Sequence, residues 1–182
     1  IPNAKSGTGT ITCDTYNGST KIGSKTCSFT ATVSESASKP TLSPTVVDSN
    51  STTTSLTGDS SKFIKYYSNA SVSTGASARN SATLKSQKIT CGAKSISSAS
   101  GTINKVESGS FTFSATDSRG YTTTKTVKKT LINYIKLTCS LNAGAPTTDG
   151  VATLKISGNY WDGSFGKVAN TLTVQYRYKS KG

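Results

Sequence analysis

The groups available for catalysis in this chain are carboxylates and thiols, because the sequence contains no histidine. The usual general base at neutral pH is therefore missing. The eight carboxylates are Asp14, Glu35, Asp48, Asp59, Glu107, Asp117, Asp149 and Asp162. None has a close acidic neighbour, most lie beside Gly or Ser in turn-like contexts, and a glycosidase would need two of them across a cleft. We predict no catalytic residue and no enzymatic activity.

The four cysteines are Cys13, Cys27, Cys91 and Cys139. None of their spacings matches a zinc knuckle, and no histidine is present to complete a site, so we expect neither a metal nor a cofactor. Cys27 alternates with Phe29 and is expected to face a core, and Cys13 shares a face with Ile11. Buried reduced thiols are the main expectation, and a disulfide between Cys13 and Cys27 is the alternative.

The candidate ligand-binding residues are Tyr160, Trp161, Asp162 and Phe165, which lie together in a glycine-rich stretch. Tyrosine and tryptophan beside an aspartate can stack on a sugar ring and bond its hydroxyls. Alternatively, Trp161 and Phe165 cover the end of a sheet and build a subunit interface. Arg119 is a further candidate because a guanidinium binds carboxylate or phosphate, although it fits a solvated turn equally well.

The formal net charge is +13, with 21 basic against 8 acidic residues. Scattered lysines are typical of a soluble face that protects strand edges, and they also suit attraction to a polyanion. Only three arginines are present and the aromatic residues are not interleaved with them, which disfavours nucleic-acid binding. No apolar run reaches the roughly 18 residues of a membrane span.

A β-hairpin is predicted between Gly109 and Tyr134, and it contains Asp117 and Arg119. Phe111, Phe113 and Ala115 alternate with polar residues, which predicts a strand with one buried face. Asp117–Gly120 reads as a tight turn, opened by Asp and closed by a glycine with positive φ. Since a hairpin alone is only marginally stable in water, further strands must cover the phenylalanine face.

An earlier hairpin is predicted from Thr10–Tyr16 and Lys25–Val33 around the turn signal Asn17-Gly18, with an irregular stretch over 19–24. Phe63–Ser73 is a further predicted strand. We expect about seven strands and no helix in the central part of the chain, because β-branched residues are frequent and no apolar 3.6-residue period is sustained.

After residue 134 the expected strands are Val151–Ser157, with Ala152, Leu154 and Ile156 facing inward, and Leu172–Lys179. In the second of these, Leu172, Val174, Tyr176 and Tyr178 are expected to share one side. So short a unit cannot form an independent two-sheet domain. We expect it to be completed by a further segment of chain or by another subunit.

Three stretches resemble a known family. The DSRG turn at 117–120, between a Phe-alternating strand and a Thr/Lys/Val strand that ends at Asn133-Tyr134, resembles immunoglobulin-like repeats in minor tail proteins of long-tailed (siphovirus-type) phages of Gram-positive hosts. LTGDSSKFIKYYS at 56–68 is similar to the opening of these repeats. GNYWDGSFGKVANTLTVQYRYK at 158–179 resembles the module that follows them. The resemblance implies no catalytic residues.

The fold class expected from pattern and resemblance is all-β, with tandem immunoglobulin-like β-sandwich domains of which the terminal ones are incomplete. Residues 1–36 are predicted to be the C-terminal hairpin of a preceding repeat, 37–134 a central sandwich, and 135–182 the start of a third β module. The chain lacks methionine and starts at Ile1, so we expect a piece of a longer polypeptide.

The resemblance implies a non-catalytic structural segment of a phage tail-tip or tail-fibre protein, which scaffolds other parts and contacts the host surface. It implies location in the virion tail, after assembly in the reducing host cytoplasm. Expected partners are other tail or baseplate proteins, further copies of the chain in a homo-oligomer, and host cell-wall glycopolymer; nucleic acid and membrane are not expected. The alternatives are a repeat of a secreted bacterial adhesin and a carbohydrate-binding module.

Overall fold

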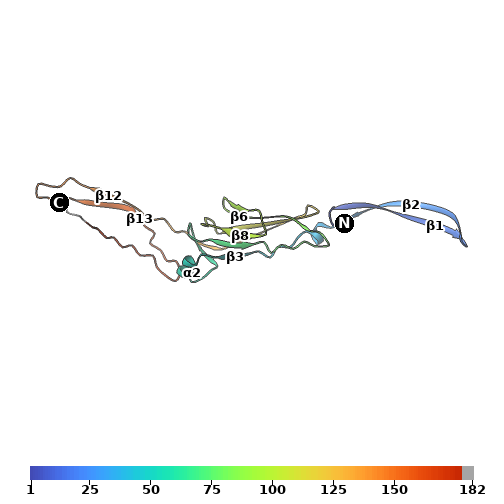
Figure 1. The fold of residues 1–182 in the computed structure, drawn as a ribbon, viewed down its shortest axis with the longest axis horizontal. Coiled ribbons are helices and arrows are strands. Elements are labelled where there is room, and N and C mark those ends of the chain that lie inside the picture. The colour runs from blue at the N-terminus through green and yellow to red at the C-terminus, as the bar shows by residue number, and fades with distance from the viewer. Residues whose placement is uncertain (178–182) are drawn as a thin grey trace. The chain divides into compact units, whose positions relative to one another are not determined.

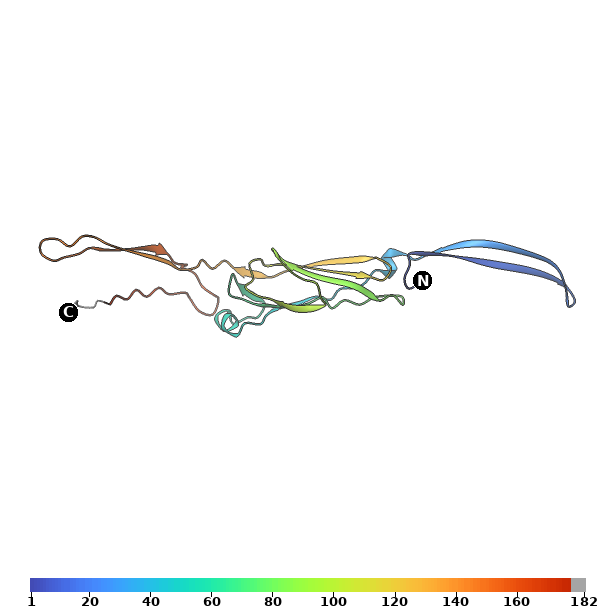
Figure 2. The same ribbon diagram turned by 45° about the horizontal axis from the view of Figure 1, so that its top comes forward.

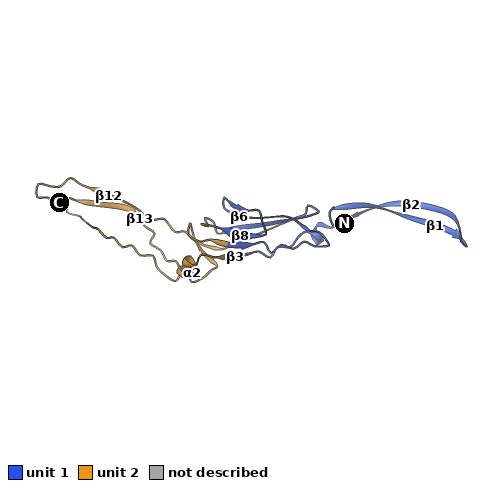
Figure 3. Cartoon of the chain, viewed as in Figure 1, with its two compact units in different colours: residues 1–46, 71–103, 110–128 blue, residues 47–70, 104–109, 129–182 orange. Residues whose placement is uncertain are grey.

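A computed structural model describes residues 1–177, and over this range the chain is all-β, with several sheets of which none is closed. The chain divides into two compact units (Figure 3): unit 1 contains residues 1–46, 71–103 and 110–128, and unit 2 contains residues 47–70, 104–109 and 129–182.

The main sheet of unit 1 has the strand order β10-β9-β6-β7, with β6 (Leu84–Cys91), β7 (Lys94–Ile96), β9 (Ser110–Asp117) and β10 (Thr122–Lys128). Phe111, Phe113 and Ala115 of β9 are buried, which confirms the predicted alternation. In the neighbouring strand, Ile89 lies opposite Phe113 and Cys91 lies opposite Phe111. Apolar side chains that are adjacent on one sheet face therefore form the centre of this core.

A second sheet has the order β3-β5-β8, with β3 (Thr45–Asp48), β5 (Ala70–Ser73) and β8 (Ser100–Ile103). Val46, Val72 and Ile103, one from each strand, are buried. All three belong to unit 1. The buried apolar residues of unit 1 therefore come from both sheets.

The turn between β9 and β10 forms as predicted. Gly120 has a φ of 85° and its N–H donates to the carbonyl of Asp117 at 3.0 Å. The Asp117 carboxylate accepts from the backbone N–H of Arg119 at 3.0 Å and of Tyr121 at 2.9 Å. Asp117 thus closes the turn through its own side chain.

The first strands of unit 1, β1 (Ser6–Asn17) and β2 (Thr20–Thr32), form a two-stranded hairpin (Figure 1). The predicted irregular stretch at 19–24 is correct in part. Residues 20–24 belong to β2, so the loop is no longer than the turn, but the register changes within them: Thr15 pairs with Gly23 and Tyr16 with Lys21, which leaves Ile22 out of the register.

The expectation of no helix is wrong. Within residues 1–177 there are two short helices, α1 (Glu35–Ser38) and α2 (Ser51–Thr57). The α2 helix starts because the Asn50 side chain accepts the Thr52 N–H at 3.0 Å, and it ends at Gly58, which has a left-handed φ of 67°. Caps at both ends stabilise a threonine-rich helix that has no apolar period.

In unit 2, β4 (Lys62–Ile64) pairs in parallel with β11 (Thr130–Ile132). The predicted continuous strand Phe63–Ser73 is wrong, since a turn with a φ of 70° at Tyr66 interrupts it. The buried carboxylate of Asp48 stabilises this turn by accepting hydrogen bonds from the hydroxyls of Thr53 (2.5 Å) and Ser68 (2.6 Å). It thereby connects α2 to the turn.

Unit 2 also contains a second hairpin, β12 (Thr138–Ala143) with β13 (Leu154–Asn159) (Figure 2). The predicted strand Val151–Ser157 is thus displaced toward the C-terminus by a few residues. The predicted strand Leu172–Lys179 is not a strand over 172–177, and its last two residues, Tyr178 and Lys179, lie outside the described residues.

Candidate functional site

The β1–β2 hairpin has one apolar face and one polar face. Ile11 lies opposite Cys27, and Gly9 lies opposite Phe29. Since directly opposite residues share a face, Ile11, Cys13, Cys27 and Phe29 form one surface, here called the first apolar face. The predicted sharing of a face is confirmed. The predicted burial is wrong: Ile11 is 58% and Phe29 is 49% exposed, and both cysteines are exposed free thiols.

The opposite face of this hairpin carries hydroxyls. Thr12 and Thr26 hydrogen-bond across the strands at 2.9 Å, and Ser24 donates to the carboxylate of Asp14 at 2.6 Å. Lys21 forms an ion pair with the same carboxylate at 2.8 Å. Several polar groups of one face therefore bond to one another within the hairpin, while the other face exposes apolar side chains to water.

The β12–β13 hairpin repeats this arrangement. Leu141 lies opposite Ile156, and Ala143 lies opposite Leu154. Together with Cys139 these residues form the second apolar face. The expectation that Leu154 and Ile156, together with Ala152, point into a core is wrong, because all three are exposed. On the polar face, the hydroxyls of Ser140 and Ser157 are 2.7 Å apart.

A groove of about 600 Å³ runs between the second apolar face and the extended segment 172–177. Leu172, Val174 and Tyr176 line it, as do Leu141 and Ile156. Thr173, Gln175 and Arg177 line the groove as well, so the prediction that Leu172, Val174 and Tyr176 share one side stays a prediction. The volume is enough for additional side chains between the two walls.

Four aromatic rings of unit 2 form a cluster around Tyr134. The ring centre of Tyr134 lies 5.2 Å from that of Tyr67, 5.6 Å from Trp161 and 5.9 Å from Phe165, and Trp161 lies 4.8 Å from Phe165. These are the separations of favourable aromatic pairs. Phe165 is buried and Trp161 is half-buried, so packing against neighbouring rings occupies much of both side chains.

A small loop holds Trp161 and Phe165 in place. The Asn170 side chain donates to the Trp161 carbonyl at 2.6 Å, and the Asn170 N–H donates to the Gly163 carbonyl at 2.8 Å. The Lys167 N–H donates to the carbonyl of Leu56 in α2 at 3.2 Å. The loop is thereby attached to the helix that the sequence did not predict.

The other two candidates of this stretch lie at the surface. Tyr160 and Asp162 are exposed, and a hydrogen bond from Tyr160 to the Asp162 carboxylate raises the pKa of the tyrosine above its ordinary value. The structure therefore divides the predicted group into an inward pair, Trp161 and Phe165, and an outward pair. Ligand binding by these residues stays a prediction.

The turn is not solvated at Arg119, which is only 6% exposed. Its Nε donates to the Ile1 carbonyl at 2.8 Å, and its Nη1 donates to the Arg79 carbonyl at 3.0 Å. Nη1 also contacts the carboxylate of Asp117 at 3.4 Å, and Nη2 donates to the carbonyl of Asn80. These contacts give the guanidinium a structural task within unit 1, and a ligand role for it stays a prediction.

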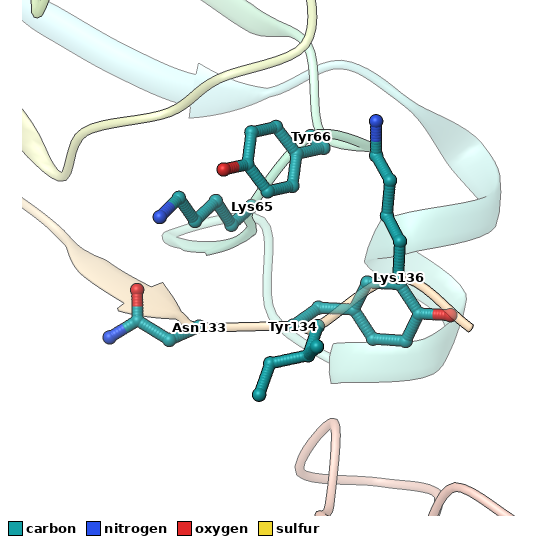
Figure 4. Close-up of a pocket in the computed structure, with 6 residues that line it drawn as sticks. Lys65, Tyr66, Asn133, Tyr134 and Lys136 are labelled. Carbon is teal, nitrogen blue, oxygen red and sulfur yellow. The ribbon is translucent and has the colours of Figure 1, made fainter. Parts of the chain in front are cut away.

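A pocket of about 480 Å³ was not predicted from the sequence (Figure 4). Its lining residues are Lys65, Tyr66, Asn133, Tyr134, Ile135 and Lys136. The only signal in the sequence is a lysine close to a tyrosine in both segments, KYY at 65–67 and YIK at 134–136. The parallel pairing of β4 with β11 brings the two segments together.

A family described as "Siphovirus protein of unknown function (DUF859)" matches residues 1–178. The chain belongs to this family. It is therefore a viral protein, which supports the phage part of the resemblance drawn from the DSRG turn and its neighbours, and it is a phage-type protein of siphoviruses. No curated protein matches the chain.

In this siphovirus protein, residues 1–177 contain no group of three or more acidic or cysteine side chains that could hold a metal ion. Over the same residues, no helix has the length and apolar character needed to cross a bilayer. The candidate functional surfaces are the two apolar hairpin faces and the pocket lined by Lys65, Tyr66 and Lys136.

Proposed function

We propose that this chain is a non-catalytic structural segment of the siphovirus tail, within a tail-tip or tail-fibre protein, and that it acts as a scaffold assembled from several copies of itself. Membership of a siphovirus family supports the viral setting. The observation that carries the scaffold role is the pair of hairpins whose apolar faces are open to water.

An isolated two-stranded hairpin is at best marginally stable in water. Burying one large apolar side chain contributes about 1.5–3 kcal/mol. The first apolar face offers Ile11 and Phe29 for such burial, and the second offers Leu141, Leu154 and Ile156. Covering these faces therefore converts two marginal hairpins into stable sheet layers.

The chemistry of the faces favours a second copy of the chain as the covering surface. The chain has a net charge of +13, so most of its surface repels another copy. The second apolar face contains no charged residue, and the first contains only Lys25 at its end. At a two-fold interface each patch meets the same patch of the other copy. Two copies can therefore pair along these apolar residues, with Lys25 at the edge of the contact.

We further propose that the four-stranded and three-stranded sheets form an immunoglobulin-like sandwich in a tandem array. Seven strands divided four and three are typical of that fold. The hairpins at 6–32 and 138–159 then belong to incomplete neighbouring modules. Such an array forms a stiff rod that holds other parts of the tail in place. Its loops contact other tail or baseplate proteins and the cell-wall glycopolymer of a Gram-positive host.

The non-catalytic part of the proposal is supported by the lack of histidine and by the role of the carboxylates in turns, as with Asp117. Sedimentation velocity of the 182-residue chain over a range of concentrations tests the scaffold role. We expect a discrete assembly of fixed stoichiometry. A monomer at every concentration would argue against it.

A further inference from the structure

We propose that the pocket lined by Lys65, Tyr66, Asn133, Tyr134, Ile135 and Lys136 binds the phosphate group of a phosphorylated polyol, such as a glycerol-phosphate unit. The pocket lies within unit 2. Its volume of about 480 Å³ is in the range of small-molecule sites. The proposal goes beyond the scaffold role and does not depend on it.

Two uncompensated positive charges define the site. The Nζ of Lys136 lies over the Tyr66 ring at 4.8 Å from its centre, and the Nζ of Lys65 lies over it at 5.1 Å. Figure 4 shows the two lysine side chains on either side of the ring. Neither lysine forms an ion pair within residues 1–177, and no carboxylate lines the pocket. Lysine ammonium groups are point charges suited to phosphate.

The backbone of Tyr66 has a strained conformation, and this conformation places the tyrosine ring between the two lysines. Its φ is 70°, a left-handed value that a bulky side chain rarely adopts. The surroundings hold it there, since the Tyr66 N–H donates to the Val106 carbonyl at 2.8 Å and the Lys65 N–H donates to the Ile132 carbonyl at 3.0 Å. Glycine would adopt this φ without strain. Strain of this kind gathers at functional sites.

The arrangement of the lysines around the Tyr66 ring also favours one class of ligand over others. Lysine ammonium groups lie over the Tyr66 ring, so it is not free to stack on a sugar or a base, and no arginine lines the pocket. This disfavours a neutral sugar and a single-stranded nucleic acid. Figure 4 shows the Tyr66 hydroxyl and the Lys65 ammonium on the same side of the pocket as the Asn133 amide. These groups can bond phosphate oxygens and the hydroxyls beside them.

Titration of the chain with glycerol 3-phosphate, followed by NMR shifts of the amides at 65–67 and 133–136, tests this site. We expect saturable binding and no binding of glycerol. Replacing Lys65 and Lys136 together by Met should weaken binding at least tenfold. The matched control replaces Lys85 and Lys125, exposed lysines of unit 1, by Met; it removes the same charge and should change binding less than twofold.

Tyr66→Gly separates function from folding. It should keep or raise the unfolding midpoint, because the strain is relieved, while it weakens glycerol-phosphate binding at least tenfold. The proposal is overturned if glycerol 3-phosphate does not bind saturably, if the control lysine pair weakens binding as much as the pocket pair, or if Tyr66→Gly binds as well as the natural chain. Tighter binding of a mixed-sequence oligonucleotide at equal phosphate concentration would overturn it in favour of nucleic acid.

Discussion

The ring of Phe29 in β2 covers the backbone of Gly9 in β1. A Cβ atom built on Gly9 would lie 2.6 Å from Cζ of Phe29, closer than any real side-chain contact. An aromatic ring laid over a cross-strand glycine stabilises a sheet that the glycine alone would weaken. The contact fixes where the largest side chain of the first apolar face lies, with 49% of it still exposed.

Gly9→Ala should therefore displace the Phe29 ring and lower the free energy of unfolding by up to about 1 kcal/mol, the range of a cross-strand pair. Gly7→Ala is the matched control on the same strand face, because its new Cβ would meet only the end of the Ile1 side chain at 3.3 Å. Urea denaturation measures both. Equal effects of the two substitutions would show that the ring does not depend on Gly9.

Asp48→Ala should destabilise unit 2 by about 3 kcal/mol. The substitution removes the acceptor of the buried Ser68 hydroxyl and of the Asn50 and Asn69 N–H groups, whereas the Thr53 hydroxyl keeps the Asn50 carbonyl at 3.1 Å. A buried polar group without a partner costs about 1–3 kcal/mol. Asp59→Ala is the control, since its ion pair with Lys62 at 3.8 Å is exposed and surface ion pairs contribute little to stability. Urea denaturation followed by Trp161 fluorescence compares them, and similar losses would contradict the bridging role of Asp48.

Arg119→Lys should destabilise unit 1 by about 2 kcal/mol although it keeps the charge. A lysine ammonium cannot reproduce the planar set of donors that reaches the carbonyls of Ile1, Arg79 and Asn80. Arg79→Lys should be nearly neutral, because that side chain is exposed. Thermal unfolding of the two variants provides the comparison, and an unchanged midpoint for Arg119→Lys would exclude a structural task for the guanidinium.

The β1–β2 hairpin should loosen in acid. The Lys21 ammonium, and then the Ser24 hydroxyl, hold the pKa of Asp14 below its ordinary value of 3.8. Because the pKa is lowered in the folded state, the stabilisation is present above 3.8 and is lost as the pH falls through the folded pKa. Amide exchange of the hairpin from pH 5 downward measures the effect. Asp14→Asn should remove this pH dependence, and its persistence in the variant would assign it to another group.

Local patterns in the sequence were enough to predict β9, its turn and the shared face of Ile11 and Cys13, because alternation and turn chemistry act over a few residues. Burial of that face could not be predicted correctly, because alternation indicates which residues share a face and not whether another surface covers it. The α2 helix was not predicted because its caps, rather than an apolar period, define it.

The pocket at Tyr66 was not predicted for a different reason. Lys65 and Lys136 meet at one tyrosine ring only through the parallel pairing of β4 with β11, and no local pattern reports the pairing of distant strands. Among the candidates chosen from the sequence, Trp161 and Phe165 were correctly grouped as aromatic neighbours. Their partner Tyr134 could not be inferred from spacing.

The central claim is that copies of the chain cover the two apolar faces, and native mass spectrometry of face-specific variants tests it most directly. Phe29→Asp and Leu141→Asp place a charge on the apolar faces, whereas Thr12→Asp and Ser140→Asp place it on the polar faces of the same hairpins. Circular dichroism confirms that each variant keeps its strands. We predict that the natural chain and the polar-face variants share one oligomeric mass, and that the apolar-face variants fall to monomer. An unchanged mass for the apolar-face variants, or a monomeric natural chain, would contradict the account.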